Sequence, residues 1–320
     1  MGFSLLSLID LFVRRAYTAA GLRPHTVSID ADTTVQCWIS SSLLPPPSSS
    51  GDVEPEKTKK PPLLLIHGFG TSGTFQWRSQ IRTLAAHFDV IVPDLLFFGG
   101  STTRSPQRSE AFQADALVAL LDALGVRPPR RARVSVVGTS YGGFVAYHVA
   151  RKMGPEQVDR VVIASSDLLK GPEDDRALLE RAGGGASVDE IMLPRTPADM
   201  KRLGRLAVYH QPRYVPECIL RGVLRSMLKD NLQEKLELIK GISISNKDEF
   251  QLTPLPQQVL IIWGEHDQIF PLEKAFQIQK RLGENVRLEV VEKTSHLPQM
   301  EDTKKFNQLL LGFLLDAPKS

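Results

Sequence analysis

The apolar residues of this chain follow two alternating patterns. Short continuous runs rich in valine, isoleucine and leucine are separated by longer stretches in which apolar residues recur at helical spacing. Strands without polar alternation, separated by helices, are typical of a parallel sheet that helices cover on both faces. We therefore expect an α/β fold with a mostly parallel central sheet. The runs that predict strands are 63–66, 90–92, 134–137, 161–164, 259–263 and 286–291, and the stretches that predict helices are 77–87, 108–124, 143–153, 272–282 and 306–313.

Three segments depart from that pattern. Residues 26–30 and 33–40 alternate in the manner of two antiparallel strands, whereas residues 168–250 show helical spacing and glycine or proline punctuation without a strand-like run. Proline and polar residues dominate 44–62, which we expect to be a surface loop. The predicted organisation is an N-terminal amphipathic helix (1–25), a core (26–167 and 251–320) and a helical cap inserted over the sheet (168–250).

Composition narrows the class of protein without identifying it. The 320 residues are 42% hydrophobic and 23% charged, which is ordinary for a globular protein with a large core. A net charge of +3, with no RNA-binding motif, gives no indication of nucleic-acid binding. The two cysteines, Cys37 and Cys218, lie far apart and predict neither a disulfide framework nor a zinc site. The oligomeric state stays open.

The N-terminal apolar run is too short and too interrupted to be a targeting or spanning segment. It extends from Phe3 to Val13, contains Asp10, and is followed rather than preceded by Arg14 and Arg15. A secretory signal places its positive charge first, and a spanning helix needs about twenty apolar residues. We expect an intracellular protein, cytoplasmic or peripheral on a membrane. Its first helix would either pack on the body or lie on a membrane surface.

One strand-to-helix turn carries the clearest chemical signal. A buried strand runs into Gly138-Thr139-Ser140-Tyr141-Gly142, and a helix follows at once. So tight a turn forces the serine into a strained backbone conformation, and the two glycines avoid clashes around it. The helix also directs its free N–H groups and positive end at the same point. The pattern predicts an exposed nucleophile, Ser140, at a site where an anion forms.

A serine needs an oriented base, and the later strands supply candidates in the order acid, then histidine. Asp267 stands just after the strand 259–263, at the edge where sites of parallel sheets lie, and Glu265 in the same turn is the alternative acid. His296 follows the last strand and is the candidate base. His266, beside the acid, is the competing histidine.

The anion that forms on the substrate needs two N–H donors. One should be the amide of Tyr141, directly after the nucleophile, and the other the amide of Phe69, in the loop after the strand 63–66. Gly68 and Gly70 on either side of Phe69 allow the backbone to approach a substrate. His67 is expected to hold this loop by a side-chain hydrogen bond.

These motifs resemble the α/β-hydrolase superfamily, and in particular plant serine hydrolases similar to monoacylglycerol lipases and to bacterial C–C bond hydrolases. They run in the family's order over most of the chain, and the resemblance implies the family's fold and its Ser140, Asp267 and His296 triad. One departure is that many relatives have a Gly-His-Gly-like stretch where this chain has Leu95-Leu96-Phe97-Phe98-Gly99. The motifs are HGFG (67–70), PDLLFFGGS (93–101), GTSYGG (138–143), WGEHDQIFP (263–271) and TSHLPQ (294–299).

Two apolar features bear on the substrate. The bulky 95–98 stretch either favours an apolar substrate near the entrance or fills the core. The cap carries two apolar stripes, which either face an acyl chain or pack inward. The stripes are Met200, Leu203, Leu206, Val208 and Tyr209, and Ile219, Leu220, Val223, Leu224 and Met227.

The leading prediction is a carboxylic ester hydrolase acting on a lipid-like ester such as a monoacylglycerol, without metal or organic cofactor. One alternative is a C–C bond hydrolase, which would need cationic groups in the pocket. Another is a receptor-like protein with slow turnover and a cap that changes on binding. Residues 195–240 contain ten basic and five acidic side chains, an excess of +5. This excess is typical of a solvated face, or it contacts an anionic membrane.

Overall fold

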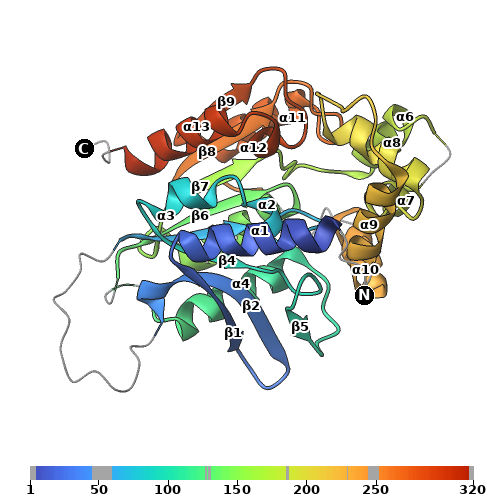
Figure 1. The fold of residues 1–320 in the computed structure, drawn as a ribbon. Helices are drawn as coiled ribbons and strands as arrows, with labels where there is room; N and C mark the ends of the chain where they lie inside the picture. The colour runs from blue at the N-terminus through green and yellow to red at the C-terminus, as the bar shows by residue number, and fades with distance from the viewer. Residues whose placement is uncertain are drawn as a thin grey trace.

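A single mixed sheet organises the molecule. The computed structural model describes residues 5–44, 60–126, 128, 131–184, 187–228, 230–243 and 252–316. The strands lie in the order β1-β2-β4-β3-β6-β7-β8-β9, with β5 paired to β2 (Figure 1). From β4 to β9 neighbouring strands are parallel, and β1 and β2 are antiparallel additions at one edge. The strands are β1 (Leu22–Ser28), β2 (Thr33–Ser40), β3 (Pro62–Ile66), β4 (Asp89–Pro93), β5 (Thr102–Thr103), β6 (Val134–Thr139), β7 (Val158–Ala164), β8 (Gln258–Gly264) and β9 (Val286–Val291).

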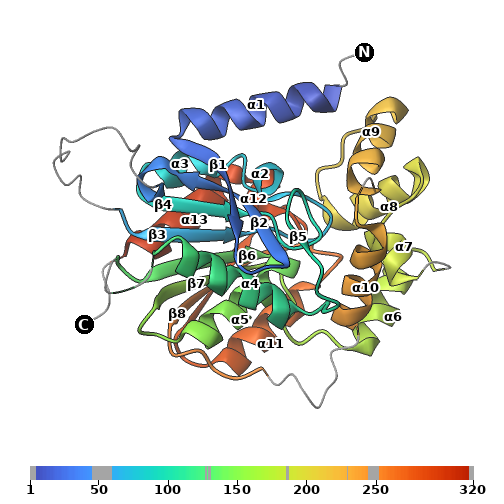
Figure 2. The same cartoon turned by 90° about the horizontal axis from the view of Figure 1, so that it is seen from below.

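Helices cover both faces of the sheet because its central strands are apolar on both sides. Every residue of β3, β4 and β6 is buried. One core lies between the sheet and α4, α5 and α11, and a second between the sheet and α1, α3 and α13. In Figure 2, α1 and α3 lie above the strands and α4, α5 and α11 below them. The core helices are α1 (Leu5–Ala19), α2 (Gly73–Gln76), α3 (Ile81–Ala85), α4 (Glu110–Ala123), α5 (Tyr141–Met153), α11 (Leu272–Leu282), α12 (Pro298–Glu301) and α13 (Thr303–Leu315).

The cap is helical and lies beyond one end of the central strands, at the right of Figure 1. Each of its helices comes from the segment between β7 and β8, so the parallel core continues on either side of it. Residues 185–186, 229 and 244–250 of the predicted cap lie outside the described residues. The cap helices are α6 (Pro172–Arg181), α7 (Val188–Met192), α8 (Pro197–Ala207), α9 (Glu217–Leu228) and α10 (Leu232–Ser243).

The N-terminal helix is shorter than the predicted segment 1–25. It ends at Ala19, Gly21 adopts a left-handed φ of 86°, and β1 begins at Leu22. The predicted strand 26–30 therefore starts earlier, because Leu22 pairs with Ser40 across the antiparallel ladder. That ladder supplies hydrogen bonds to a polar stretch whose own sequence does not predict a strand.

Smaller differences follow from local packing. Of the predicted helix 77–87 only Ile81–Ala85 (α3) is helical, a second short helix (α2) ends just before it at Gln76, and the two-residue strand β5 was not expected. Most of the predicted surface loop 44–62 lies outside the described residues, which resume at Lys60. Among the described residues, no helix is both long and apolar enough to cross a membrane.

A buried ionic cluster joins the start of the cap to the core. Asp167, just beyond β7, is fully buried, and its Oδ2 lies 3.2 Å from Nζ of Lys274 on α11. The same ammonium lies 2.6 Å from Oδ1 of Asp174 on α6. Burial raises the pKa of Asp167 to about 6, although the charge of Lys274 acts in the opposite direction.

The raised pKa of Asp167 predicts a pH-dependent contribution to stability. Because the folded protein binds this proton more tightly than the unfolded chain, whose pKa is about 3.9, the group's contribution is lost as pH rises from about 4 to about 6. As the pH rises from about 4 to about 6, the free energy of unfolding of Asp167→Asn, measured with urea, should therefore increase relative to that of wild type. Asp115→Asn, at an exposed aspartate of α4, is the control, and a constant difference between Asp167→Asn and wild type would contradict the assignment.

Candidate active site

The turn after β6 holds Ser140 in the strained conformation that the sequence predicts. Its φ is 52° and its ψ is −124°, a region that residues with a side chain rarely occupy. Its N–H donates to the carbonyl of Ala164 at 2.8 Å, and its own carbonyl accepts from the N–H of Gly143 at 2.9 Å. These two bonds fix the serine between β7 and the first turn of α5.

Two glycines are needed for this turn because backbone atoms fill the space around them. A Cβ on Gly138 would lie 2.1 Å from the carbonyl oxygen of Gly142. A Cβ on Gly142 would lie 2.5 Å from the carbonyl oxygens of both Ile66 and His67. The start of α5 is therefore pressed against the end of β3, which brings Ser140 close to the loop that follows that strand.

Ser140, His296 and Asp267 form a continuous hydrogen-bonded relay. Oγ of Ser140 lies 2.9 Å from Nε2 of His296, and Nδ1 of His296 lies 2.9 Å from Oδ2 of Asp267. The other carboxylate oxygen of Asp267 accepts the N–H groups of Ile269 and Phe270 at 2.8 and 2.9 Å. With the aspartate charged, Nδ1 carries the proton and Nε2 is free to accept one from the serine.

The competing acid and base point elsewhere. The carboxylate of Glu265 accepts the N–H of Lys293 at 3.0 Å, and the ring of His266 stacks on Tyr209 with centroids 4.5 Å apart. Both side chains are about 40% exposed, in contrast to Asp267 and His296, which are buried. The structure brings neither alternative into contact with Ser140.

His67 orders the loop after β3 in the way the sequence predicts. Its Nε2 accepts the N–H of Leu95 at 2.9 Å, and its Nδ1–H donates to the carbonyl of Gly68 at 2.7 Å. A ring whose Nε2 accepts an N–H is neutral, and burial lowers the pKa of His67 in agreement with this, although the charge of Asp94 opposes the shift. The histidine thereby ties the loop to the chain that follows β4.

The same loop lies against the nucleophile. A Cβ on Gly68 would lie 3.1 Å from Cβ of Ser140, and Gly70 adopts a left-handed φ of 82°. Within the described residues, no hydrogen bond uses the backbone N–H of Phe69 or of Tyr141. Both predicted donors are therefore available beside Ser140, and the Phe69 and Tyr141 rings pack edge to face with centroids 6.1 Å apart.

An apolar pocket opens at Ser140 between the sheet and the cap. Among the described residues that line it, Lys170 is the one with a charged side chain. Lys170 is buried, and its Nζ lies 2.5 Å from Oδ1 of Asp175. The cap contributes side chains from α6, α7 and α10, a wall that the sequence did not identify. The lining residues are Phe69, Ser140, Tyr141, Phe144, Lys170, Leu178, Val188, Met192, Ile239, Ile242, Ile269 and Phe270.

The apolar features singled out in the sequence do not line this pocket. Leu206, Leu220 and Leu224 of the two cap stripes are buried, because α8 packs against α7 and α9 within the cap. The bulky 95–98 stretch fills the core: all four side chains are buried, and the Phe98 ring contacts the rings of His67 and Phe69 at 5.4 and 5.2 Å. Of the two alternatives that the sequence leaves open for each feature, burial of these side chains favours packing in the interior.

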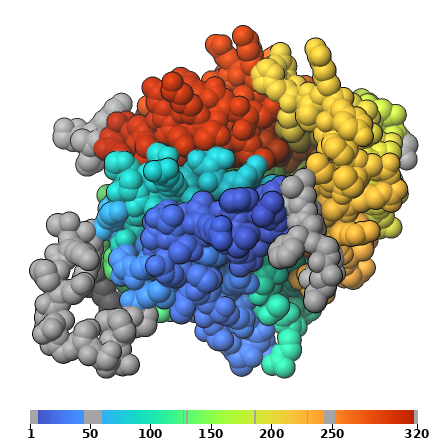
Figure 3. All heavy atoms as spheres, viewed as in Figure 1, coloured from blue at the N-terminus to red at the C-terminus, as the bar shows by residue number. Residues whose placement is uncertain are grey.

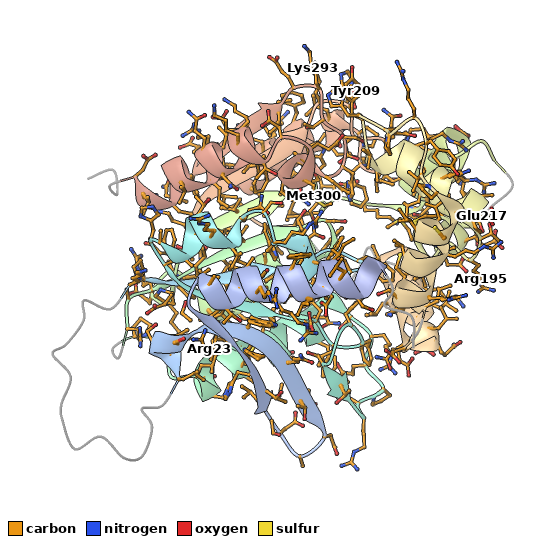
Figure 4. All side chains as sticks on the ribbon, viewed as in Figure 1. Arg23, Arg195, Tyr209, Glu217, Lys293 and Met300 are labelled. Atoms are coloured by element: carbon orange, nitrogen blue, oxygen red, sulfur yellow. The ribbon has the colours of Figure 1, made fainter. Side chains whose placement is uncertain are left out.

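Glu301 is a further site residue that the sequence did not identify. Its Oε1 accepts the N–H of Ser295, directly before His296, at 2.7 Å. Its Oε2 accepts the N–H groups of Tyr209 and His210, in the connection between α8 and α9, at 2.7 and 3.1 Å. One carboxylate thus joins the histidine loop to the cap. In the view of Figure 4, Tyr209 stands at the top of the molecule beside Lys293, which belongs to the histidine loop.

The glycine contacts predict a sharp difference between two substitutions. Gly142→Ala should destabilise the fold by about 1–3 kcal/mol, because its methyl group would meet backbone carbonyls that cannot move aside. Gly204→Ala is the matched control: it lies within α8 with open space around it, so it should be neutral or stabilising by up to about 1 kcal/mol. Equal unfolding free energies for the two variants would refute this account of the turn.

The Glu301 bridge predicts that a residue outside the relay controls nucleophile reactivity. Glu301→Ala removes the acceptor that positions the His296 loop, so labelling of Ser140 by a fluorophosphonate should slow by roughly tenfold or more. Glu301→Gln keeps one acceptor oxygen and should lose less. Glu292→Ala, at an exposed glutamate in the same loop, is the control, and unchanged labelling of Glu301→Ala would exclude a positioning role.

Comparisons with known proteins agree with this fold. The chain is 29% identical over 273 residues to 2-hydroxymuconate semialdehyde hydrolase of Pseudomonas putida, covering 80% of this chain and 88% of that protein. It is 27% identical to Lipase 1 of Psychrobacter immobilis, covering 75% and 72% of the two chains. A bacterial membrane phospholipase A superposes with a TM-score of 0.73 at 23% identity, covering 97% and 91%. These bacterial relatives do not test the resemblance to plant enzymes.

A family model matches three quarters of the chain. It is the model of the alpha/beta hydrolase fold, and it aligns with residues 61–303, which include the turn at Ser140, Asp267 and His296. The chain belongs to the alpha/beta hydrolase fold family.

Proposed function

We propose that this hydrolase cleaves carboxylic esters of a lipid-like kind, such as a monoacylglycerol, through Ser140, His296 and Asp267. The observation that carries the proposal is the relay, in which two contacts of 2.9 Å join the serine, the histidine and the aspartate. Such a relay supplies an activated alcohol next to an oriented base. A buried nucleophile at the mouth of an apolar pocket suits an acyl group.

In the proposed reaction Ser140 attacks the carbonyl carbon while His296 takes the serine proton. Asp267 holds the imidazole and stabilises the positive charge that develops on it. His296 then gives the proton to the departing alcohol, which leaves an acyl group on the serine. Water, activated by the same histidine, releases the acid and restores Ser140. The sequence of steps uses side chains of this chain alone and needs no metal or organic cofactor.

The amides of Phe69 and Tyr141 would bind the oxyanion. Both belong to segments that Gly68 and Gly142 bring against Ser140, and both lie free of other hydrogen bonds in the described residues. The N-terminus of α5 adds its positive dipole end at the same position. Donors fixed before the reaction gain most from charge that appears only in the transition state, each being worth roughly 3 kcal/mol.

The pocket lining favours an acyl chain over a small polar acid. Apart from Ser140 and Lys170 its lining consists of apolar or aromatic residues, and Asp175 neutralises the charge of Lys170. Burying methylene groups against such a wall contributes about 0.8 kcal/mol for each group. The pocket therefore supports binding that grows with acyl length until the wall formed by α7 and α10 is reached.

A C–C bond hydrolase is the second candidate. Two observations favour it: Lys170 places a buried ammonium in the pocket, and the Pseudomonas putida relative carries the name of such an enzyme. A dienol carboxylate would have to compete with Asp175 for that ammonium. The ion pair is the reason that we rank ester cleavage first.

Removal of the nucleophile is the first test. Ser140→Ala should abolish fluorophosphonate labelling and lower kcat for a short soluble ester by roughly 10⁶-fold. Asp267→Asn leaves the serine in place but removes the charge that orients His296, and should lower kcat by roughly 10⁴-fold. Labelling that survives Ser140→Ala would overturn the assignment.

Graded substrates separate the candidate activities. kcat/KM should rise with acyl length on p-nitrophenyl or monoacylglycerol esters, because each added methylene enters the apolar pocket. Faster cleavage of a dienol carboxylate than of any ester, reduced by Lys170→Met, would favour the C–C hydrolase instead. Slow turnover of both substrate classes would favour a receptor-like role.

A further inference from the structure

Helix α1 carries two apolar stripes, and only one of them packs on the body. Val13 and Tyr17 are buried, and the Tyr17 hydroxyl donates to the carbonyl of Thr74 at 3.1 Å. The second stripe consists of Leu8, Leu11 and Phe12, spaced three and four residues apart, which are 42%, 41% and 58% exposed. These side chains present apolar surface to water. Such exposure is unfavourable unless another apolar surface covers the side chains.

A further exposed aromatic side chain belongs to the neighbouring helix α2, where Arg78 stacks on it at 4.1 Å. α1 contacts both α2 and the cap helix α9, and Phe75 of α2 is 40% exposed. Figure 3 shows α1 lying across the middle of one face of the molecule with the cap beside it. We call Leu8, Leu11, Phe12 and Phe75 the α1 face. Figure 2 shows that α1 and one end of α9 reach the same side of the molecule, so a flat surface could touch both.

Exposed arginines lie on α1, where Arg15 follows Leu11 and Phe12 by four and three residues, and on the neighbouring helix α9. Together α1 and α9 carry four arginines and two acidic residues. Asp10 pairs with Arg14 at 2.7 Å and Glu217 pairs with Arg221 at 2.5 Å. Arg15 and Arg225 are the remaining two, and both are exposed. Arginines beside an apolar stripe can keep their guanidinium groups at the level of lipid phosphates while their aliphatic stems lie along the stripe.

Helix α1 lies outside the part of the chain that the family model describes, although the phospholipase A superposition covers 97% of the chain. The match to the family model starts at residue 61. None of the relay residues or pocket-lining residues belongs to α1. Its outer stripe therefore has no role in the chemistry proposed above.

We propose that the α1 face docks the protein on the surface of an anionic lipid membrane, with α1 lying parallel to that surface. An amphipathic helix binds in this way through its buried apolar area and its attraction to negative headgroups. A protein partner would not need the exposed arginines, whereas phosphate headgroups match them. The inference does not depend on which bond the enzyme cleaves.

The test is sedimentation of the full chain with phosphatidylcholine vesicles that contain or lack phosphatidylserine. Wild type should partition at least about tenfold more strongly onto the anionic vesicles, and Phe12→Glu should lower that partition by about tenfold or more. Phe276→Glu is the matched control, because Phe276 is 53% exposed on α11, on the opposite side of the molecule in Figure 2. It should bind as wild type does, and both variants should hydrolyse a short soluble ester at the wild-type rate.

Three results would overturn the proposal. The first is absence of wild-type sedimentation, or equal partition onto neutral and anionic vesicles. The second is an equal loss of binding in Phe276→Glu and Phe12→Glu. The third is a wild-type dimer in light scattering that Phe12→Glu converts to a monomer, because the stripe would then be covered by a second copy. Vesicle binding is measured without substrate, so its failure is distinct from a failure of the ester assignment.

Discussion

The backbone of Ser140 occupies a conformation that a residue with a side chain adopts only when its surroundings impose it. Here the surroundings are the carbonyl of Ala164, the first turn of α5 and the end of β3, which touches Gly142. The same contacts bring Gly68 against the serine. The backbone geometry of Ser140 and the approach of the loop 67–70 therefore depend on the same packing contacts, and neither could be changed alone.

The cap is joined to this arrangement by two polar links, one made of ion pairs and the other of hydrogen bonds. At its start, Lys274 of the core bridges Asp167 and Asp174 in a buried cluster. Further along, the Glu301 carboxylate accepts N–H groups from the cap connection and from the histidine loop. Buried polar groups are tolerated when they are paired, and both links meet that condition. The cap and the relay are therefore parts of one hydrogen-bonded structure.

Most of the core and the three relay residues could be predicted because they leave local marks. Continuous apolar runs predicted the parallel strands, and the glycines around Ser140 predicted a strained turn. Features that depend on tertiary packing could not be predicted, because no local sequence pattern indicates them. The end of α1 depends on the pairing of Leu22 with Ser40. The role of Glu301 depends on three N–H groups, two of which lie more than 90 residues away in the chain. Apolar stripes in the cap could not indicate which helices face the pocket.

The pocket wall and the reacting groups come from different parts of the chain. The cap wall is built by α6, α7 and α10, whereas the relay stands on turns after β6, β8 and β9. Substitutions at Val188, Met192 or Ile239 can therefore reshape the wall while the hydrogen bonds of the relay stay in place. Because the wall and the relay come from different segments, substitutions confined to the cap can change substrate selectivity while the relay stays the same.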